Sequence, residues 1–182
     1  MIVKLTVAVL LRVAVGVWPH FDAKPYYIVP FAILFSTPFQ AGEEIGWRGY
    51  SLPRLAERFG LPMASLMLGL IWGCWHLPQF FIREADTYHQ SFWVFVLGVT
   101  ALSVILARLW QRTSGSLLLT MLLHSAWNNS KDIVPSGVPR DTETFGFNAS
   151  LVSWFTLAVL WVYAACLLPA MSRGRQHRVI DA

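Results

Sequence analysis

The chain has 182 residues, of which 55% are hydrophobic and only 13% are charged, and nine of them are tryptophans. Because a soluble domain carries about a quarter charged residues, this composition excludes an ordinary soluble protein and predicts an integral membrane protein. The net charge of +4 comes from Lys and Arg residues scattered between apolar segments. That distribution excludes the continuous basic face typical of a nucleic-acid-binding protein.

Six apolar segments follow one another along the chain, and each is predicted to be a helix. Backbone groups in lipid must be hydrogen-bonded within their own segment, and these runs are too long to be strands of a barrel. The sequence therefore predicts an all-α, polytopic transmembrane helical bundle of about six spans. One membrane domain accounts for residues 1–172, and a short basic tail follows at 173–182. The six segments are 1–18, 26–42, 61–82, 91–109, 115–129 and 150–170.

Charges in the connections predict how this bundle is oriented. The connections after the second, fourth and sixth segments carry Arg48, Arg54, Arg58, Arg108, Arg112, Arg173, Arg175 and Arg178. The opposite connections carry only Lys24, Arg83, Lys131 and Arg140. Because cytoplasmic connections are enriched in Lys and Arg, the end that holds Glu43 and Glu44 is predicted to face the cytoplasm, together with the C-terminus.

The third segment contains a proline close to a histidine. Pro78 follows His76 and is expected to end or kink the helix, which frees a backbone carbonyl beside the histidine. The two cysteines, Cys74 and Cys166, both fall in predicted spans. Buried free thiols are expected there rather than a disulfide.

Two adjacent glutamates follow directly on the second apolar segment. Carboxylates near hydrocarbon are costly, so they mark a candidate functional site. In a helix, Glu44 and Arg48 are i,i+4 neighbours with the acid first, the favourable order for an ion pair. Glu43 is offset by about 100° and has no such partner. We therefore expect Glu44 and Arg48 to brace the helix and Glu43 to face the site; the alternative is that both glutamates are interfacial charges at a helix end.

Two histidines also lie inside apolar segments. His76 ends the run LIWGCWH, and His124 shares a helical face with Asn128 in LLLTMLLHSAWNN. Each alone is explained by packing or by interhelical hydrogen bonds. One carboxylate and two imidazoles are together the minimum set that binds a zinc ion with its water, or that activates water directly. No HExxH motif occurs, which excludes a standard zincin helix, and no GxSxG motif supports a serine peptidase.

Three short motifs resemble a known family. They are EEIGWRGY at Glu43–Tyr50, WGCWH at Trp72–His76 and HSAWN at His124–Asn128. They are similar, in order, to the EExxxR, FxxxH and HxxxN/D motifs of the CAAX prenyl endopeptidase and bacteriocin-processing (CPBP, or Abi) intramembrane proteases. The resemblance covers about residues 30–130.

The resemblance implies a role for each matched residue. Glu43 would be the general base and would polarise a water molecule together with His76. His124 and Asn128 would stabilise the oxyanion or share in binding a metal, while Glu44 and Arg48 would hold the site together. A zinc ion bound by Glu43, His76 and His124 stays an open alternative, because the family is described both as metalloproteases and as glutamate-dependent proteases.

The resemblance also implies a substrate class and a location. The expected function is an intramembrane endopeptidase that hydrolyses membrane-associated or lipid-modified, CAAX-like proteins or peptides in a prokaryotic plasma membrane. Its partners would be membrane lipid and the substrate, with no nucleic acid. The alternatives are a non-catalytic membrane scaffold or bacteriocin-immunity protein that binds a partner, and a proton-coupled transporter. A transporter would favour inverted repeats, and none is evident.

The chain departs from the family pattern in two respects. Trp72 stands where the second motif has phenylalanine, an aromatic replacement that is expected to change packing rather than chemistry. In addition, only 42 residues precede Glu43, whereas family members usually carry additional spans there. The expectation is a short member or a truncated start.

Overall fold

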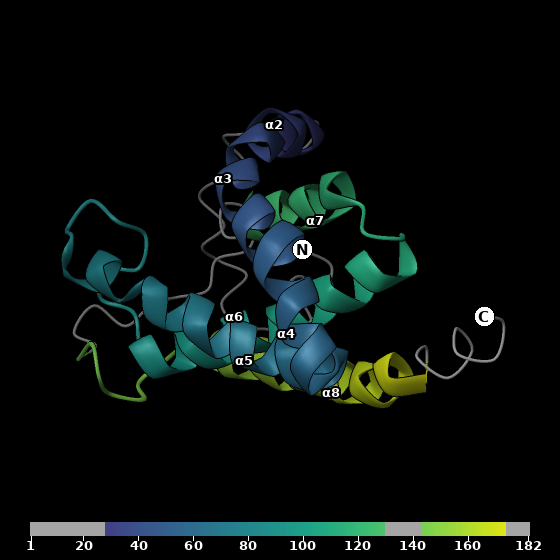
Figure 1. The fold of residues 1–182 in the computed structure, drawn as a ribbon. Helices are drawn as coiled ribbons and strands as arrows, with labels where there is room; N and C mark the ends of the chain where they lie inside the picture. Colours follow the sequence, from purple (N-terminus) through teal and green to yellow (C-terminus); the bar gives the residue numbers. More distant parts are fainter. Residues whose placement is uncertain (1–27, 130–142, 174–182) are drawn as a thin grey trace, which may run out of the picture.

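The computed structural model describes residues 28–129 and 143–173, and in these ranges the regular structure is entirely helical (Figure 1). The longest of these helices are α6, with 21 residues, and α8, with 23 residues. The elements in chain order are α2 (Ile28–Ser36), η1 (Thr37–Gln40), α3 (Ala41–Glu44), η2 (Ile45–Ser51), α4 (Leu52–Phe59), α5 (Leu61–Trp75), η3 (Leu77–Phe81), α6 (Phe92–Arg112), α7 (Leu117–Asn129) and α8 (Leu151–Arg173).

Close packing of α5 against α6 forms the centre of the molecule. Gly69 and Gly73 lie four residues apart and so share one face of α5. A Cβ atom on Gly69 would lie 2.6 Å from the Cα of Thr100, and one on Gly73 would lie 3.1 Å from the Cα of Val96. Small residues at this spacing let helices in membranes approach at backbone distance. The contact runs antiparallel and fixes the last turns of α5 against α6.

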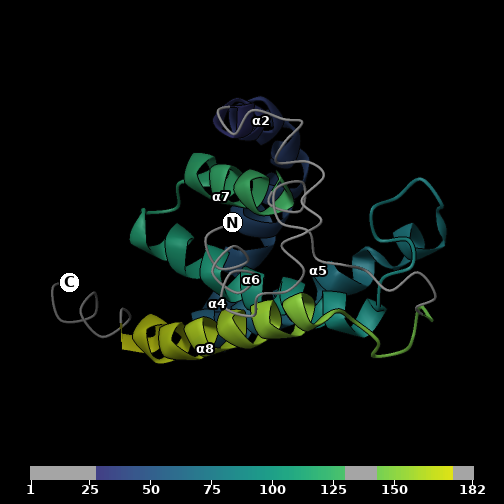
Figure 2. The ribbon, with the colours of Figure 1, turned by 180° about the vertical axis from the view of Figure 1, so that it is seen from behind.

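The helix α8 lies along α6 and runs in the same direction (Figure 2). At the far ends of the two helices, Arg108 Nη1 donates to Ala170 O at 3.2 Å and Gln111 Nε2 donates to Met171 O at 3.3 Å. At the near ends, Phe92 N donates to Thr144 O at 2.8 Å. The helix α5 therefore begins where α6 and α8 end, so Arg58 and Arg108 lie at the same end of the bundle.

Three of the predicted spans are confirmed as helices that are long and apolar enough to cross a membrane. They are Leu61–Phe81, Phe92–Arg112 and Leu151–Ser172. The segments 26–42 and 115–129 are helical but shorter: α2 has 9 residues and α7 has 13. Proline in η1 and the left-handed turn at Gly115 limit them. A bundle of six spans is thus not confirmed; segment 1–18 and nearly all of the tail 173–182 lie outside the described residues.

The third segment breaks where its proline predicts. The helix α5 ends at Trp75, and the chain continues as η3, which has Pro78 in its first turn. The His76 backbone N–H turns to Gly73 O at 3.2 Å, which leaves Trp72 O without its usual i+4 donor. The His76 side chain contacts that carbonyl instead, with Nδ1 2.8 Å from Trp72 O. The predicted free carbonyl beside the histidine is therefore present.

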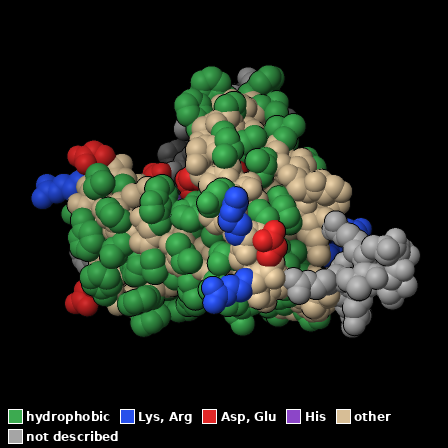
Figure 3. Space-filling model, in the orientation of Figure 1, with side chains coloured by type: hydrophobic (Ala, Val, Ile, Leu, Met, Phe, Trp, Pro, Cys, Tyr) green, Lys and Arg blue, Asp and Glu red, His purple; other side chains and the backbone are tan. Residues whose placement is uncertain are grey.

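The visible outer surface is mainly hydrophobic, with few charged side chains (Figure 3). Large apolar side chains stand out from α2 and η1, among them Phe31, Phe35 and Phe39, which are 68%, 78% and 73% exposed. Such a surface suits contact with lipid rather than water, and the chain is an integral membrane protein. Cys74 and Cys166 are free, as expected, but they are exposed on this surface instead of buried.

Candidate active site

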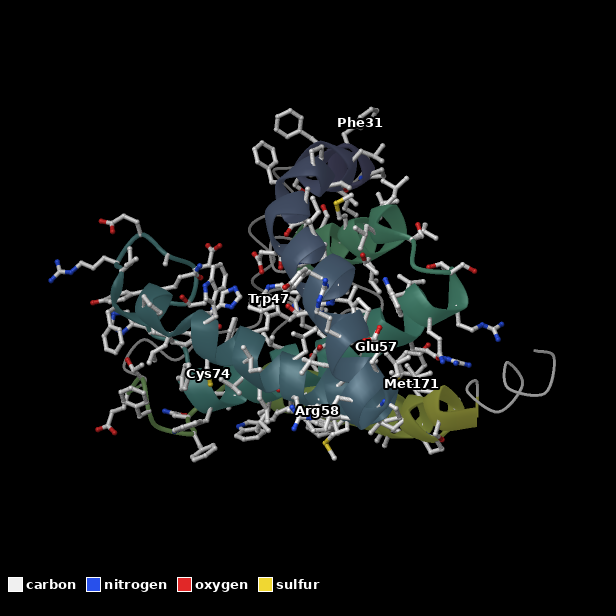
Figure 4. The ribbon with its side chains drawn as sticks, in the orientation of Figure 1. Phe31, Trp47, Glu57, Arg58, Cys74 and Met171 are labelled. Carbon is white, nitrogen blue, oxygen red and sulfur yellow. The ribbon has the colours of Figure 1, made fainter. Side chains whose placement is uncertain are left out.

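The two glutamates lie in one continuous helical run that changes its winding. The run passes from α3, which ends at Glu44, directly into η2, a π-helical stretch of 7 residues that contains Arg48. In Figure 4 this run descends from Phe31 on α2, past Trp47, to Glu57 and Arg58 on α4. Rare π-helical turns occur frequently at functional sites.

The second glutamate belongs to a buried charged cluster. Glu44 and Arg48 are both completely buried, and Arg48 Nη1 lies 2.8 Å from Glu44 Oε1. The predicted contact between them is therefore present. Nδ1 of His124, which is 3% exposed, lies 2.9 Å from the same oxygen. Because η1 and α3 pack against α7, the cluster ties the glutamate-bearing run to the histidine-bearing helix.

The first glutamate points elsewhere and has a partner that the sequence reasoning did not assign. Glu43 is half-buried, and its Oε2 accepts a hydrogen bond of 2.6 Å from Nε1 of Trp72. The expectation that Trp72 changes packing more than chemistry did not include this hydrogen bond, which phenylalanine could not donate. The available signal was a tryptophan inside an apolar helix, whose N–H must find an acceptor when it is buried.

His76 lies beside Trp72 on the same last turn of α5. It is half-buried, with its ring centroid 5.0 Å from that of Trp75 and 5.2 Å from that of Phe95. Its Nδ1 is held by Trp72 O. These contacts fix the imidazole plane from three sides, although no hydrogen bond joins it to Glu43.

Asn128 lies one turn beyond His124 on α7, as the i,i+4 spacing predicts. It is exposed, and its Nδ2 lies 3.4 Å from Gln40 Oε1. Gln40, near the end of the second apolar segment, is buried. It is a further polar contact of the site that the motifs did not indicate.

One cavity of about 740 Å³ brings the predicted catalytic residues together. Glu43, His76, His124 and Asn128 all line it, whereas Glu44 and Arg48 do not. Its other walls include apolar side chains from α6 and α8: Val94, Phe95, Val99, Leu102, Leu157 and Leu160. Polar side chains, among them Gln79, Glu84 and Asp86, make up much of the remaining wall. The cavity therefore combines an apolar wall from α6 and α8 with a polar one, and its size fits a ligand.

The residues expected to hold zinc do not assemble into a metal site here. Within residues 28–129 and 143–173, no three His, Cys, Asp or Glu side chains come close enough to hold a metal ion together. Instead, Glu43, His76 and His124 each direct one polar atom to a protein partner: Trp72 Nε1, Trp72 O and Glu44 Oε1 respectively. The zinc-bound alternative stays a prediction.

Comparison with known proteins bears on the motifs that build this site. The family model of the type II CAAX prenyl endopeptidases, Rce1-like, matches residues 23–130, which include all three motifs. The chain belongs to this family. The resemblance drawn from the motifs is thereby confirmed.

A curated relative of this Rce1-like chain is CAAX prenyl protease 2 of Methanococcus maripaludis. The two are 28% identical over 121 residues, which is 63% of this chain and 43% of the relative. The chain thus spans less than half the length of the relative it matches. No solved structure matches the chain.

Proposed function

We propose that the chain is a CAAX prenyl endopeptidase that cleaves lipid-modified proteins or peptides inside the membrane. The observation that carries this proposal is that Glu43, His76, His124 and Asn128 line one cavity in a chain of the Rce1-like family. A non-catalytic scaffold or immunity protein would not require a carboxylate and two imidazoles from three separate helical elements to face one cavity. The printed name of the relative, a CAAX prenyl protease, supports the substrate class.

In the proposed reaction a water molecule lies between Glu43 and His76. Glu43 takes a proton from the water as its oxygen attacks the peptide carbonyl carbon, which forms a tetrahedral oxyanion. His124 and Asn128 face the same cavity and would stabilise this oxyanion by donating hydrogen bonds. The proton on Glu43 then passes to the departing amine as the carbon–nitrogen bond breaks, which restores the carboxylate.

The apolar walls of the cavity would hold the lipid part of the substrate. Leu102 and Val99 from α6 face the same space as Leu157 and Leu160 from α8. Inside the membrane a prenyl chain exchanges lipid for these side chains, so close packing against them, rather than removal from water, would hold it. The scissile bond would then lie beside Glu43.

The direct test is cleavage of a prenylated peptide with a C-terminal CAAX sequence in proteoliposomes. We predict that Glu43→Gln, which keeps the shape of the side chain but removes the base, lowers kcat by at least about a hundredfold, within the range typical of general bases. His124→Ala should also abolish cleavage. Glu57→Gln is the matched control, because Glu57 is an exposed carboxylate on α4 and should cleave like the wild type.

Three outcomes of these experiments separate the alternatives. Normal cleavage by both Glu43→Gln and His124→Ala would refute the protease assignment and favour a scaffold that binds a partner. Zinc at one ion per chain, with cleavage lost on chelation and restored by zinc, would favour the zinc-dependent alternative; loss of the zinc in Glu43→Gln or His124→Ala would then identify these residues as ligands. Full activity of metal-free protein is the outcome expected for the glutamate–water mechanism.

A further inference from the structure

Trp72 occupies an unusual position among the side chains of the site. It is 1% exposed, the largest of the fully buried side chains. Its indole N–H turns away from the backbone and donates to Glu43 Oε2 at 2.6 Å. A hydrogen bond to a charged acceptor contributes more than one between neutral groups, so this contact restrains the carboxylate strongly.

The ring of the same tryptophan contacts the buried charged cluster. The Arg48 guanidinium carbon lies 4.3 Å from the ring centroid, within the range of a cation–π contact. The His124 ring meets it edge-to-face, with centroids 5.0 Å apart and planes at 81°. Glu44 fixes both Arg48 and His124 through its Oε1. The indole is thus clamped on its face and edge by groups that are themselves immobilised.

We propose that Trp72 is the positioning residue of Glu43, and that it transmits the geometry of the Glu44–Arg48–His124 cluster to the cavity. This role rests on the proposed function of Glu43 as a base. The indole N–H has one proton to donate and no acceptor capacity, so it always holds Oε2 from the same side. The other oxygen, Oε1, is left to take the proton from water.

The hydrogen bond persists through the proposed reaction. When Oε1 carries the proton taken from water, Oε2 becomes the carbonyl oxygen of a neutral acid and still accepts from the indole. Trp72 therefore gains and loses no proton. Its contribution is orientation. It keeps the carboxyl plane fixed while Oε1 first takes a proton from the water molecule and then gives it to the departing amine.

The test removes the N–H while keeping an aromatic ring at position 72. Trp72→Phe and, as a closer match in shape, replacement of Trp72 by 3-benzothienylalanine, in which sulfur stands for the N–H, would be assayed in proteoliposomes. We expect kcat to fall about ten- to hundredfold, the size expected for a lost hydrogen bond to a charged group, with KM within about twofold. Trp93→Phe, on the exposed start of α6, should leave both constants unchanged.

A spectroscopic arm tests the same contact without any assay of cleavage. The ultraviolet resonance Raman band that reports indole hydrogen bonding should lose a strongly bonded component in Trp72→Phe. Glu43→Ala should remove the same component. If Glu43→Ala leaves that component unchanged, or if the benzothienyl protein keeps the kcat of the wild type, the proposal is overturned. Inactive wild-type protein with the expected Raman change would refute the proposed function but keep the contact.

Discussion

The two adjacent glutamates have different environments in this site. Glu43 lines the cavity, whereas Glu44, one residue later, is completely buried and bound to Arg48 and His124. Rotation by about 100° per residue separates them. His124 belongs to both groups, because it lines the cavity and also contacts Glu44. Substitutions at these positions should therefore fail in different ways.

Glu44→Gln should damage folding as well as catalysis. It leaves the buried Arg48 guanidinium without its hydrogen-bonded counter-charge, and removing one partner of a buried ion pair costs about 3–5 kcal/mol. We predict a lower folded yield and a lower unfolding temperature in detergent than for Glu57→Gln, the exposed control. A Glu44→Gln protein that has the stability of the wild type but no activity would give Glu44 the catalytic role instead.

At the scale of elements, the contact between α5 and α6 places the site. Gly69 and Gly73 let α5 pack closely against α6. Trp72 and His76 lie in the last turn of α5 and at its C-cap, next to this contact. Pro78 ends that helix, so Trp72 O is left for the His76 side chain. The two glycines and the proline therefore fix the positions of the Trp72 and His76 rings.

Gly69→Ala should destabilise the bundle even though alanine is the better helix former. Its Cβ would lie 2.6 Å from Thr100 Cα, which forces the two backbones apart. We predict an unfolding temperature lower by several degrees. Gly98→Ala on α6 is the matched control, because nothing lies within 4 Å of its added Cβ. It should unfold at or above the wild-type temperature; equal effects of the two changes would contradict this packing.

For the whole molecule, arginines gather at one end of the bundle. Arg58 precedes α5, while Arg108 and Arg112 lie in the last turns of α6 beside the end of α8. Arg83 follows the Leu61–Phe81 span at the opposite end. Arg48, which was counted with the same connections, is buried against Trp72 inside the span instead. The structure therefore does not place Glu43 and Glu44 at the arginine-rich end, and the cytoplasmic location of that end stays a prediction.

Cysteine labelling tests that location. In a chain with Cys74→Ala and Cys166→Ala, Arg58→Cys should react with a membrane-impermeant maleimide only when the cytoplasmic face is open to the reagent, as in inverted vesicles. Arg83→Cys, exposed beyond the other end of the same span, should react in intact cells. The reverse pattern would invert the topology.

The sequence located the candidate polar residues of the cavity better than the contacts that support them. The motif spacings located all four cavity residues and the Glu44–Arg48 contact, because i,i+4 neighbours share a helical face whatever the tertiary fold. The hydrogen bond from Trp72 to Glu43 joins residues 29 positions apart, and no local pattern reports such a contact.

The predicted count of six spans is not confirmed, for a related reason. Apolar runs such as 26–42 and 115–129 match a span in composition, but a proline follows the end of α2 and the left-handed turn at Gly115 precedes the start of α7. For helices this short, packing against neighbouring helices, rather than length, determines where they lie. The glycine pair of α5 was readable as GLIWG, yet its meaning depends on α6 lying against it.

The closeness of α5 and α6 also restricts how a substrate can travel. Where an added methyl group would meet Thr100 Cα at 2.6 Å, no prenyl chain can slide between the two helices. Under the proposed function, a lipid-bearing peptide would have to reach Glu43 by a route other than the α5–α6 interface. The two glycines that bring these helices together thus also close one path to the proposed catalytic carboxylate.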